Sequence, residues 1–468
     1  MLFSSITFLY YFLPATLAAY FLIPMPNGSP RFRNIALLIA SLAFYAWGEP
    51  MNIFLMAVET AAMWWLGLQM DRLRGSAWQK PLLVLSAVIS IGPLALFKYS
   101  GFILSSVNSL AGTDFSAPAL TLPIGISFYT FQLLSYSIDL YRGDVEPERN
   151  ILDFAAYVAL FPQLIAGPIV RYADVASELA SRKHTVGDFA VGARRFSIGI
   201  GKKVLMSNTL GELAGILKAS NDNSLLGAWL YAVAYALHIY FDFSGYSDMA
   251  IGIGRMLGFR YMENFNYPYV AKSVTEYWRR WHISLSSWFR DYVYIPMGGS
   301  RVSPARRIAN ILTVWLLTGL WHGANWNFVL WGGFFGIVLI LEKHLIGKLL
   351  DKCWPIARHA YVMLVVCLSW ALFDAQTLSS AGGVISRMLG FGSAGLAGNE
   401  PLYYLKSYAV PLILGIVGAT PAVKLLASKL ESKSASLFLQ PLATAILLLA
   451  STAFLVDGSF NPFIYFRF

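Results

Sequence analysis

Residues 308–341 read IANILTVWLLTGLWHGANWNFVLWGGFFGIVLIL, two apolar runs that meet at a short aromatic break around His322. Because about 20 mostly apolar residues cross the core of a bilayer, such runs predict helices embedded in a membrane. An ionisable side chain is costly to bury at that depth, so His322 should face the protein interior or a water-filled cavity. His322 is therefore a candidate functional residue. The alternative is a buried histidine that is hydrogen-bonded to a neighbouring helix.

Apolar runs of this kind recur along the whole chain of 468 residues. Hydrophobic residues make up 57% of the sequence and charged residues 13%, which contradicts an ordinary soluble composition. We therefore predict an all-α integral membrane protein in which residues 1–468 form a single polytopic domain. The candidate membrane segments lie near residues 3–24, 34–49, 52–70, 81–98, 119–138, 151–170, 224–243, 308–321, 326–341, 359–375, 405–427 and 437–456.

The net charge of +10 comes from lysines and arginines that gather in clusters beside the apolar runs. Such clusters mark cytoplasmic loops, and this explanation leaves no reason to expect a nucleic-acid partner. With the N-terminus outside, the basic stretches 182–203, 255–307 and 343–358 all fall in the cytoplasm, and residues 375–404 fall outside. We predict a multi-pass protein with an outside N-terminus, surrounded by membrane lipids.

Two candidate segments are interrupted by proline or glycine at membrane depth. One break is LPIG at residues 122–125, and the other is AGP at residues 166–168. Broken helices are tolerated in lipid only where they are buried in protein or line a wet cavity. Together with the gap at His322, the breaks predict re-entrant elements around an internal site. Ordinary kinks are the alternative.

The longest polar-rich stretch contains a second histidine. From Ser273 it reads SVTEYWRRWHISLSSWFRDY, and Ser273 with Glu276 has the spacing of a capping box that begins a helix. On a helical wheel the apolar and polar side chains separate into two faces, which predicts an amphipathic helix at the cytoplasmic interface within residues 271–300. The apolar face holds Trp278, Trp281, Leu285, Trp288 and Phe289, and the polar face holds Arg279, Arg280, Ser287 and Arg290. His282 lies at the edge of the apolar face, where it points into the protein or is an ordinary interfacial histidine.

A histidine in an apolar setting is suited to general-base catalysis, because desolvation disfavours its charged form. A hydroxyl that attacks a thioester needs such a base. The six histidines show no HExxH or other ligand spacing, and only two cysteines are present, so we expect no metal site. The sequence also lacks a Gly-x-Ser-x-Gly elbow and a Walker A motif, which removes the usual support for a serine hydrolase or an ATP-driven transporter.

Two carboxylates, Asp242 and Asp248, lie within or beside the apolar segment 224–243. Carboxylates at that depth are normally paired, and Arg255 and Arg279 are available as partners. We expect structural ion pairs. A role in shaping a substrate tunnel is the alternative.

The run WRRWHISLS at residues 278–286 is followed by WHGANW at residues 321–326. This combination is much more specific than either histidine alone, and it resembles the membrane-bound O-acyltransferase family. The resemblance extends over nearly the whole chain and is strongest to the bacterial branch that O-acetylates exopolysaccharides such as alginate or cellulose. It implies about 11–13 membrane-embedded helices, with re-entrant elements around a cytoplasm-facing funnel, in a bacterial inner membrane.

The resemblance also implies the reaction. The family's essential histidine matches His322, in the segment 308–341, and its second active-site position matches His282. The implied donor is acetyl-CoA, with no permanently bound cofactor, and His322 is the implied general base. The acetyl group then passes to a periplasmic or membrane-associated acceptor protein of a polysaccharide synthesis complex, as in biofilm formation.

Further residues near the two histidines are candidates for substrate or donor binding: Trp281, Arg279, Arg280, Arg290, Trp321 and Asn325. The arginines would steer the phosphates of CoA. Alternatively, they only anchor the loop at the membrane surface.

Two other functions are compatible with the sequence. In a transporter or channel, His322 and the broken helices would line a path for a small solute or an acyl carrier, without acyl chemistry. In an acyltransferase of a different specificity, a longer acyl group or a D-alanyl group would pass to a lipid or to teichoic acid. Release of CoA from acetyl-CoA would distinguish an acetyltransferase from a transporter or channel. Competition between acetyl-CoA and longer acyl-CoAs would distinguish it from an acyltransferase of a different specificity.

Overall fold

A computed structural model describes residues 1–116, 118, 120–431 and 436–458, so residue 119 of the predicted segment 119–138 lies outside it. Within these ranges every regular element is a helix, which confirms the all-α class. The chain forms two compact units. Unit 1 comprises Met1–Phe196 and Ser247–Met262, and unit 2 comprises Ser197–Tyr246 and the described residues from Glu263 onward. That residues 1–468 act as a single domain stays a prediction.

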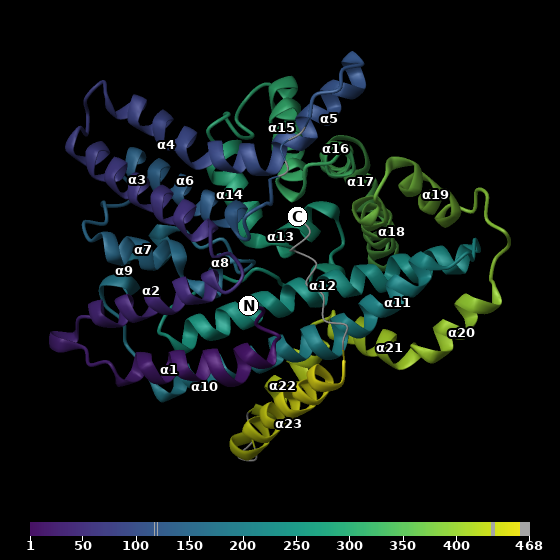
Figure 1. Cartoon of the computed structure of the whole chain (residues 1–468). Helices are drawn as coiled ribbons and strands as arrows, with labels where there is room; N and C mark the ends of the chain where they lie inside the picture. The colour runs from purple at the N-terminus through teal and green to yellow at the C-terminus, as the bar shows by residue number, and fades with distance from the viewer. Residues whose placement is uncertain (117, 119, 432–435, 459–468) are drawn as a thin grey trace. The chain divides into compact units, whose positions relative to one another are not determined.

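Unit 1 is built around a helix that is buried along nearly its whole length, α6 (Ile126–Arg142), which packs against α3, α4, α7 and α9 (Figure 1). Its other α-helices are α1 (Leu13–Leu22), α2 (Arg31–Ala46), α3 (Asn52–Arg72), α4 (Gln79–Leu94), α5 (Ser100–Ala111), α7 (Ile151–Ala159), α8 (Phe161–Leu164), α9 (Tyr172–Ala180) and the first part of α10 (Val186–Gly201). The π-helical turns η1 (Phe8–Phe12) and η3 (Ala95–Tyr99) and the 3-10 turn η2 (Pro26–Gly28) complete it.

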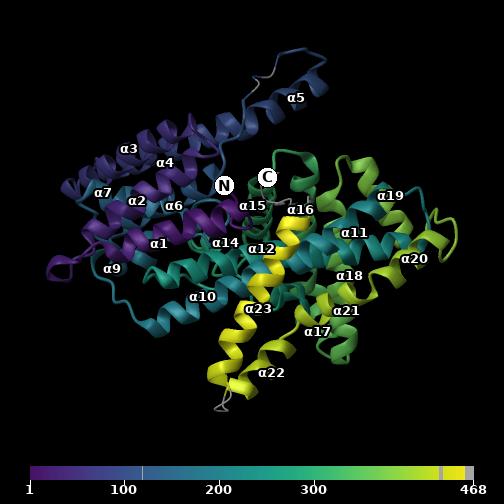
Figure 2. The same cartoon turned by 60° about the horizontal axis from the view of Figure 1, so that its bottom comes forward.

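Unit 2 contains most of the long helix α12 (Leu225–Met256), which is largely buried. Its other α-helices are α11 (Asn208–Ala219), α13 (Val274–Arg280), α14 (Ile283–Phe289), α15 (Pro304–His322), α16 (Trp326–Leu341), α17 (Gly347–Leu350), α18 (Pro355–Asp374), α19 (Leu378–Met388), α20 (Asn399–Ser407), α21 (Ala409–Gly418), α22 (Ala422–Glu431) and α23 (Ser436–Asp457). Short turns are η4 (Lys202–Ser207), η5 (Pro268–Val270), η6 (Arg290–Tyr294) and η7 (Glu342–Ile346). The last two described helices are α22 and α23, and α23 contacts η4 (Figure 2).

The helices α15 and α16 form the closest pair in unit 2. Gly319 and Gly332 face each other where the pair is tightest, and a Cβ atom at Gly319 would meet the carbonyl oxygen of Phe328. Small residues allow membrane helices to approach in this way. The close approach fixes the C-terminal end of α15, where His322 lies.

Six described helices are long and apolar enough to cross a membrane, or seven if the pair α20 and α21, bent by 63°, counts as one span. They correspond to the predicted segments 52–70, 81–98, 224–243, 326–341, 359–375, 437–456 and, for the bent pair, 405–427. The other five predicted segments also contain helices, but these are shorter or less apolar. The implied count of 11–13 membrane-embedded helices therefore stays a prediction.

The two predicted breaks in unit 1 lie against each other. Gly125, at the end of the LPIG break, has a positive φ of 79° and immediately precedes α6. A Cβ atom there would lie 2.6 Å from the carbonyl oxygen of Leu164, at the end of the short helix α8. Residues 161–170 are all buried. The interrupted backbone is therefore enclosed by protein, as expected for irregular structure in a membrane protein.

Candidate active site

His322 is the last residue of α15, and its side chain is only 3% exposed. Its Nδ1 atom lies 2.7 Å from the carbonyl oxygen of Thr318, one turn earlier in the same helix. A carbonyl oxygen can only accept a hydrogen bond, so Nδ1 carries the proton and Nε2 keeps the lone pair of the neutral ring. The Nε2 atom is therefore the nitrogen that can act as a base.

Aromatic rings enclose His322 on several sides. The ring centroids of Trp321, Trp331 and Phe373 lie 5.0, 4.9 and 5.6 Å from that of His322. These rings come from α15, α16 and α18, so three helices of unit 2 meet at the histidine. Such a setting excludes water and holds the imidazole in one orientation.

His282 lies at a break that the sequence analysis did not predict. The stretch that begins at Ser273 is two helices, α13 and α14, and not one continuous amphipathic helix. The start was predicted correctly, because the Ser273 hydroxyl accepts a hydrogen bond from the Glu276 N–H at 3.0 Å. His282 has φ 44° and ψ 54°, a left-handed conformation that residues other than glycine rarely adopt. Strained residues of this kind cluster at functional sites.

The side chain and backbone of Asn264 explain the break. The Asn264 carbonyl oxygen accepts a hydrogen bond from the Ile283 N–H at 2.9 Å. Its side-chain Oδ1 accepts hydrogen bonds from the Ser284 N–H at 3.2 Å and the Ser284 hydroxyl at 2.9 Å. Nδ1 of His282 lies 3.1 Å from the same oxygen. These contacts replace helical hydrogen bonds at the break and favour a proton on Nδ1 of His282 as well.

Trp321 brings the two histidines together. Its ring centroid lies 5.7 Å from that of His282 and 5.0 Å from that of His322. His282 is fully buried, and this burial, with the charge of His322 as a second cause, lowers the pKa of His282 well below its usual value of 6.5. A neutral His282 therefore lies beside His322. Both buried imidazoles therefore lie near the same tryptophan ring. That they form one catalytic site stays a prediction.

The other predicted binding residues have varied surroundings. Trp281 packs in an aromatic cluster, with its ring centroid 5.0 Å from Phe265 and 5.1 Å from Trp370. Asn325 is exposed, and its side chain caps the start of α16 by accepting a hydrogen bond from the Asn327 N–H at 3.1 Å. A role for Trp281 or Asn325 in binding donor stays a prediction.

The three arginines of the loop lie at or near its surface. Arg279 is exposed, whereas Arg280 pairs with Glu276 at 2.8 Å and Arg290 pairs with Asp291 at 2.6 Å. The predicted polar and apolar faces are therefore correct for these residues, although the helix is interrupted. Whether the arginines contact the phosphates of a donor stays a prediction.

Both aspartates of α12 form ion pairs, as expected, but with other partners than Arg255 and Arg279. Asp242 lies 2.7 Å from Lys203, and both side chains are almost completely buried. Asp248 lies 2.9 Å from Arg195 in unit 1. The lysine and arginine come from the basic stretch 182–203, which sequence analysis treated only as a topology marker.

Lys203 and Asn264 are the residues near the site that sequence analysis missed. The Lys203–Asp242 pair lies on one face of α12, together with His238, whose Nδ1 lies 2.9 Å from the Ser207 hydroxyl. A different face of α12 carries Phe243, whose ring centroid lies 4.6 Å from that of His282. The buried pair thus supports the helix that packs against His282. The sequence signal for Lys203 was a single charge next to an apolar segment.

Within the described ranges, no group of three or more His, Cys, Asp or Glu side chains could hold a metal ion. The two histidines lie among aromatic rings and an asparagine. Acid–base chemistry by the imidazoles fits this set of neighbours better than metal ligation does.

Comparison with known proteins identifies the family. The model of the membrane-bound O-acyltransferase family matches residues 147–373. The probable alginate O-acetylase AlgI of Azotobacter vinelandii is 40% identical over 505 residues, with 100% of each chain covered. This chain belongs to the membrane-bound O-acyltransferase family.

Two further relatives of this membrane-bound O-acyltransferase are similar over most or all of its length. The probable alginate O-acetylase AlgI of Pseudomonas aeruginosa PAO1 is 44% identical over 399 residues, which cover 84% of this chain and 76% of the relative. A peptidoglycan O-acetyltransferase of Helicobacter pylori is 30% identical over 515 residues, which cover 100% of this chain and 98% of the relative. The resemblance inferred from the two histidine motifs is therefore confirmed.

Membership of the membrane-bound O-acyltransferase family makes this protein an enzyme and a multi-pass membrane protein. The matched range 147–373 contains His282, His322 and Asn264, and also the Lys203–Asp242 pair. The candidate site and its support therefore lie inside the part of the chain that the family shares.

Proposed function

We propose that this protein is a membrane O-acetyltransferase that moves acetyl groups from cytoplasmic acetyl-CoA across the bacterial inner membrane. The final acceptor would be an exopolysaccharide of the alginate or cellulose type. The observation that carries the proposal is the Nδ1 contact of His322 with Thr318, because it leaves a basic Nε2 in a buried aromatic site. Two relatives that are named as alginate O-acetylases support the choice of polymer.

In the proposed reaction, His322 acts on the hydroxyl of the acceptor. Its Nε2 removes the hydroxyl proton while the oxygen attacks the thioester carbonyl of acetyl-CoA, which gives a tetrahedral intermediate. The carbon–sulfur bond then breaks, and CoA leaves as a thiol after taking the proton from His322. The new ester bond carries the acetyl group, so the imidazole returns to its neutral form. A base in this position contributes roughly 10² to 10⁴-fold to the rate.

His282 would have a positioning role beside this base. Its Nδ1 points to Asn264 Oδ1, so its Nε2 is the nitrogen directed to accept a hydrogen bond from a substrate N–H or O–H. An acceptor at that place orients a donor amide or an attacking hydroxyl. Positioning of reacting groups supplies a large part of enzymatic rate enhancement.

The remaining partners follow from the same proposal. The exposed Arg279 and Arg290 are suited to meet the phosphates of CoA at the mouth of a cytoplasmic funnel. On the other side, a periplasmic or membrane-associated protein of a polysaccharide synthesis complex would take over the acetyl group. This direction of transfer requires the N-terminus to lie outside.

The test uses the purified full chain in nanodiscs with radiolabelled acetyl-CoA. We expect release of CoA together with transfer of label to an added acceptor polymer or to the enzyme, and we expect His322→Ala to lose both. A transporter or channel would leave acetyl-CoA intact, and such a result would overturn the proposal. Competition by longer acyl-CoAs that is as effective as that of unlabelled acetyl-CoA would instead favour an acyltransferase of another donor specificity.

A peptidoglycan acceptor is the second candidate, because the Helicobacter pylori relative matches the whole chain at 30% identity. It differs from the first proposal only in the polymer that receives the acetyl group. Deletion of the gene followed by ester analysis of both the secreted polysaccharide and the cell wall separates the two. Loss of acetyl esters from the secreted polysaccharide alone supports the first.

A further inference from the structure

A buried carboxylate in unit 1, that of Glu59 on α3, forms no hydrogen bond and no ion pair with any residue that the structure describes. Its side chain is only 2% exposed, and α3 is a candidate membrane span. A carboxylate at such a depth is costly unless it is paired, and residues of this kind commonly mark ion sites. The proposed acetyl transfer gives Glu59 no role.

Three further polar side chains of unit 1 are buried without a hydrogen-bond partner in the described part of the chain. Tyr45 on α2 and Tyr129 on α6 have such hydroxyl groups, and both hydroxyls interact electrostatically with the Glu59 carboxylate. Gln132 has no partner for either amide atom, and it lies one turn after Tyr129 on the same face of α6. We call Tyr45, Glu59, Tyr129 and Gln132 the Glu59 cluster.

The packing of α3 against α6 places Glu59 and Tyr129 at the same level. A Cβ atom at Gly67 of α3 would lie 3.0 Å from the ring of Tyr136 of α6. Gly67 follows Glu59 by about two helical turns, and the spacing from Tyr129 to Tyr136 is also about two turns. The two helices therefore run in parallel, and the polar groups of α6 lie beside the carboxylate.

The described side chains do not neutralise the charge of Glu59. Lys98 of η3 donates to the Ser127 hydroxyl at 3.2 Å and does not interact electrostatically with Glu59. Glu49, in the loop between α2 and α3, is half-buried and accepts hydrogen bonds from Asn52 and from a backbone N–H. The buried part of the cluster thus carries one negative charge, which is costly without a counter-charge.

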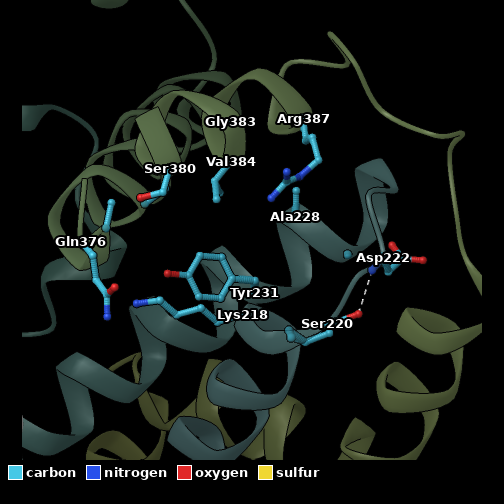
Figure 3. Close-up of a pocket in the computed structure, with 14 residues that line it drawn as sticks. Lys218, Ser220, Asp222, Ala228, Tyr231, Gln376, Ser380, Gly383, Val384 and Arg387 are labelled. Carbon is cyan, nitrogen blue, oxygen red and sulfur yellow. Dashed lines mark hydrogen bonds between the residues drawn. The ribbon is translucent and has the colours of Figure 1, made fainter. Parts of the chain in front are cut away.

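Two carboxylates of unit 2 have the partners that Glu59 lacks. Figure 3 shows Lys218 beside Tyr231 in a cavity of about 360 Å³, and both donate to the Asp374 carboxylate, at 2.6 and 2.5 Å. Asp242 is paired with a lysine 2.7 Å away. A cation bound at Glu59 would supply the positive charge that lysine supplies at these two positions.

We propose that the Glu59 cluster binds one monovalent metal cation, Na⁺ or K⁺, with the Glu59 carboxylate as the charged ligand. The cluster offers two carboxylate oxygens, two hydroxyl oxygens and one amide oxygen, which are ligands suited to a hard cation. Oxygens that hold such a cation at about 2.3–2.6 Å lie up to about 5 Å from one another, beyond hydrogen-bond distance. A divalent ion would leave an uncompensated positive charge, and a proton would occupy only one of these oxygens.

The position of the cluster indicates from which side the ion enters. Glu59 lies about two turns from the start of α3 at Asn52. With the predicted outside N-terminus, this end of α3 faces the exterior, and the half-buried Glu49 lies on the way to the cluster. A cation held by α2, α3 and α6 stabilises their folded arrangement. The inference does not depend on the proposed acetyl transfer.

The experiment measures the thermal stability and ion binding of the full chain in nanodiscs. Melting temperatures are recorded at rising concentrations of NaCl or KCl, with choline chloride keeping the ionic strength constant. We expect the melting temperature to rise by about 2–5 °C as one of the metal ions saturates the site, because a ligand of the folded protein adds stability. Equilibrium dialysis with radioactive sodium or rubidium should give one bound ion per chain.

Two variants remove ligands of different charge. Glu59→Gln keeps the size of the side chain but removes its charge, so the bound ion and the effect of NaCl or KCl on the melting temperature should both be lost. Tyr129→Phe removes one neutral oxygen and should weaken ion binding by about 10-fold. The matched control is Glu146→Gln, which removes an exposed carboxylate of the same unit and should leave ion binding unchanged.

Three results would overturn the inference. Equal melting temperatures in NaCl, KCl and choline chloride would mean that Glu59 is protonated or hydrated and holds no metal ion. Ion binding that persists in Glu59→Gln would place the ion elsewhere in the protein. Binding of Ca²⁺ that is tighter than that of both Na⁺ and K⁺ would contradict a site built around one negative charge.

Discussion

Nδ1 of His322 donates a hydrogen bond to the carbonyl oxygen of Thr318 across 2.7 Å, within the last turn of α15. The contact fixes the tautomer of the ring and leaves Nε2 as the nitrogen that can accept a proton. The position at the C-terminal end of a helix also favours a positive charge, because the helix dipole is negative there. The protonated ring that forms during the proposed reaction is therefore stabilised where it arises.

If His322 is the general base, as proposed, its replacement by alanine should lower acetyl transfer by about 10² to 10⁴-fold. The amount of protein in the membrane should stay the same. CoA release by the purified variant checks the rate, and immunoblots of membranes check the amount. The matched control is His344→Ala, which removes an exposed histidine of η7. Normal acetyl transfer by His322→Ala would contradict the assignment.

Asn264 should behave as a positioning residue for His282. Asn264→Ala removes the oxygen that contacts the Ser284 N–H and His282 Nδ1, and each buried donor left unsatisfied costs about 1–3 kcal/mol. We expect lower thermal stability and lower kcat. Asn266 is exposed in the same loop, so Asn266→Ala is the control and should change neither thermal stability nor kcat.

A pH profile separates positioning from a purely structural role of Asn264. Asn264→Asp keeps the oxygen but adds a negative charge that favours protonated His282. The acidic limb of the rate profile should therefore move to higher pH. An unchanged profile in Asn264→Asp would show that Asn264 only stabilises the loop.

The burial of His282 predicts how stability depends on pH. Because burial lowers the pKa of His282 well below 6.5, the unfolded chain binds a proton at this position at a higher pH than the folded protein does. Stability should therefore be retained above pH 6.5 and decline as the pH falls through 6.5 toward the lower folded pKa. The melting temperature of detergent-solubilised protein between pH 8 and 5 measures this decline.

The suitable comparison is His282→Asn, because asparagine tolerates the left-handed conformation at this position. This variant cannot titrate at residue 282, so its melting temperature should depend less on pH over the same interval. An identical decline in both proteins would assign the acid sensitivity to other groups.

The pattern of residues 273–292 predicted correctly where the helix begins and which side chains are buried. It could not predict the break at Trp281 and His282, because the 3.6-residue spacing of apolar side chains continues through it. The cause of the break is Asn264, 18 residues away in sequence, and its hydrogen bonds form only in the folded chain. Local periodicity contains no information about such a contact.

A similar limit applies to Asp242. Membrane burial predicted that this carboxylate would be paired, because an isolated charge is too costly. The choice of Lys203 over a nearby arginine depends on how η4 packs beside α12, which sequence spacing does not determine. The sequence predicted that His282 and His322 lie close together only because their two motifs resemble those of the membrane-bound O-acyltransferase family.

The buried pair of Lys203 and Asp242 should be essential for stability as a pair. Lys203→Met alone leaves a buried carboxylate without its counter-charge and should destabilise the protein by about 3–5 kcal/mol. The double variant Lys203→Met, Asp242→Leu removes both charges and should regain most of that loss. Melting temperatures of the three proteins provide the test.

The exposed pair of Arg149 and Asp71 is the control for this comparison. Arg149 is 79% exposed and lies 3.5 Å from Asp71, so Arg149→Met should cost less than about 1 kcal/mol. If the double variant at Lys203 and Asp242 is no more stable than Lys203→Met, loss of the Asp242 carboxylate itself destabilises the protein. The carboxylate would then have a further partner that contributes more to stability than Lys203 does.

The two native cysteines provide a test of the proposed orientation. Cys353 is exposed between α17 and α18, at the predicted cytoplasmic end of α18, and Cys367 is buried in the same helix. A membrane-impermeant maleimide should therefore label the protein in inverted vesicles and not in spheroplasts, and Cys353→Ser should abolish the labelling. In that background, Ser379→Cys places an exposed thiol in α19, at the opposite end of α18, and should be labelled in spheroplasts. If both thiols show the reverse labelling pattern, the basic stretch 343–358 lies outside. That result would also contradict an outside N-terminus, because the side of this stretch was assigned by counting membrane spans from the N-terminus.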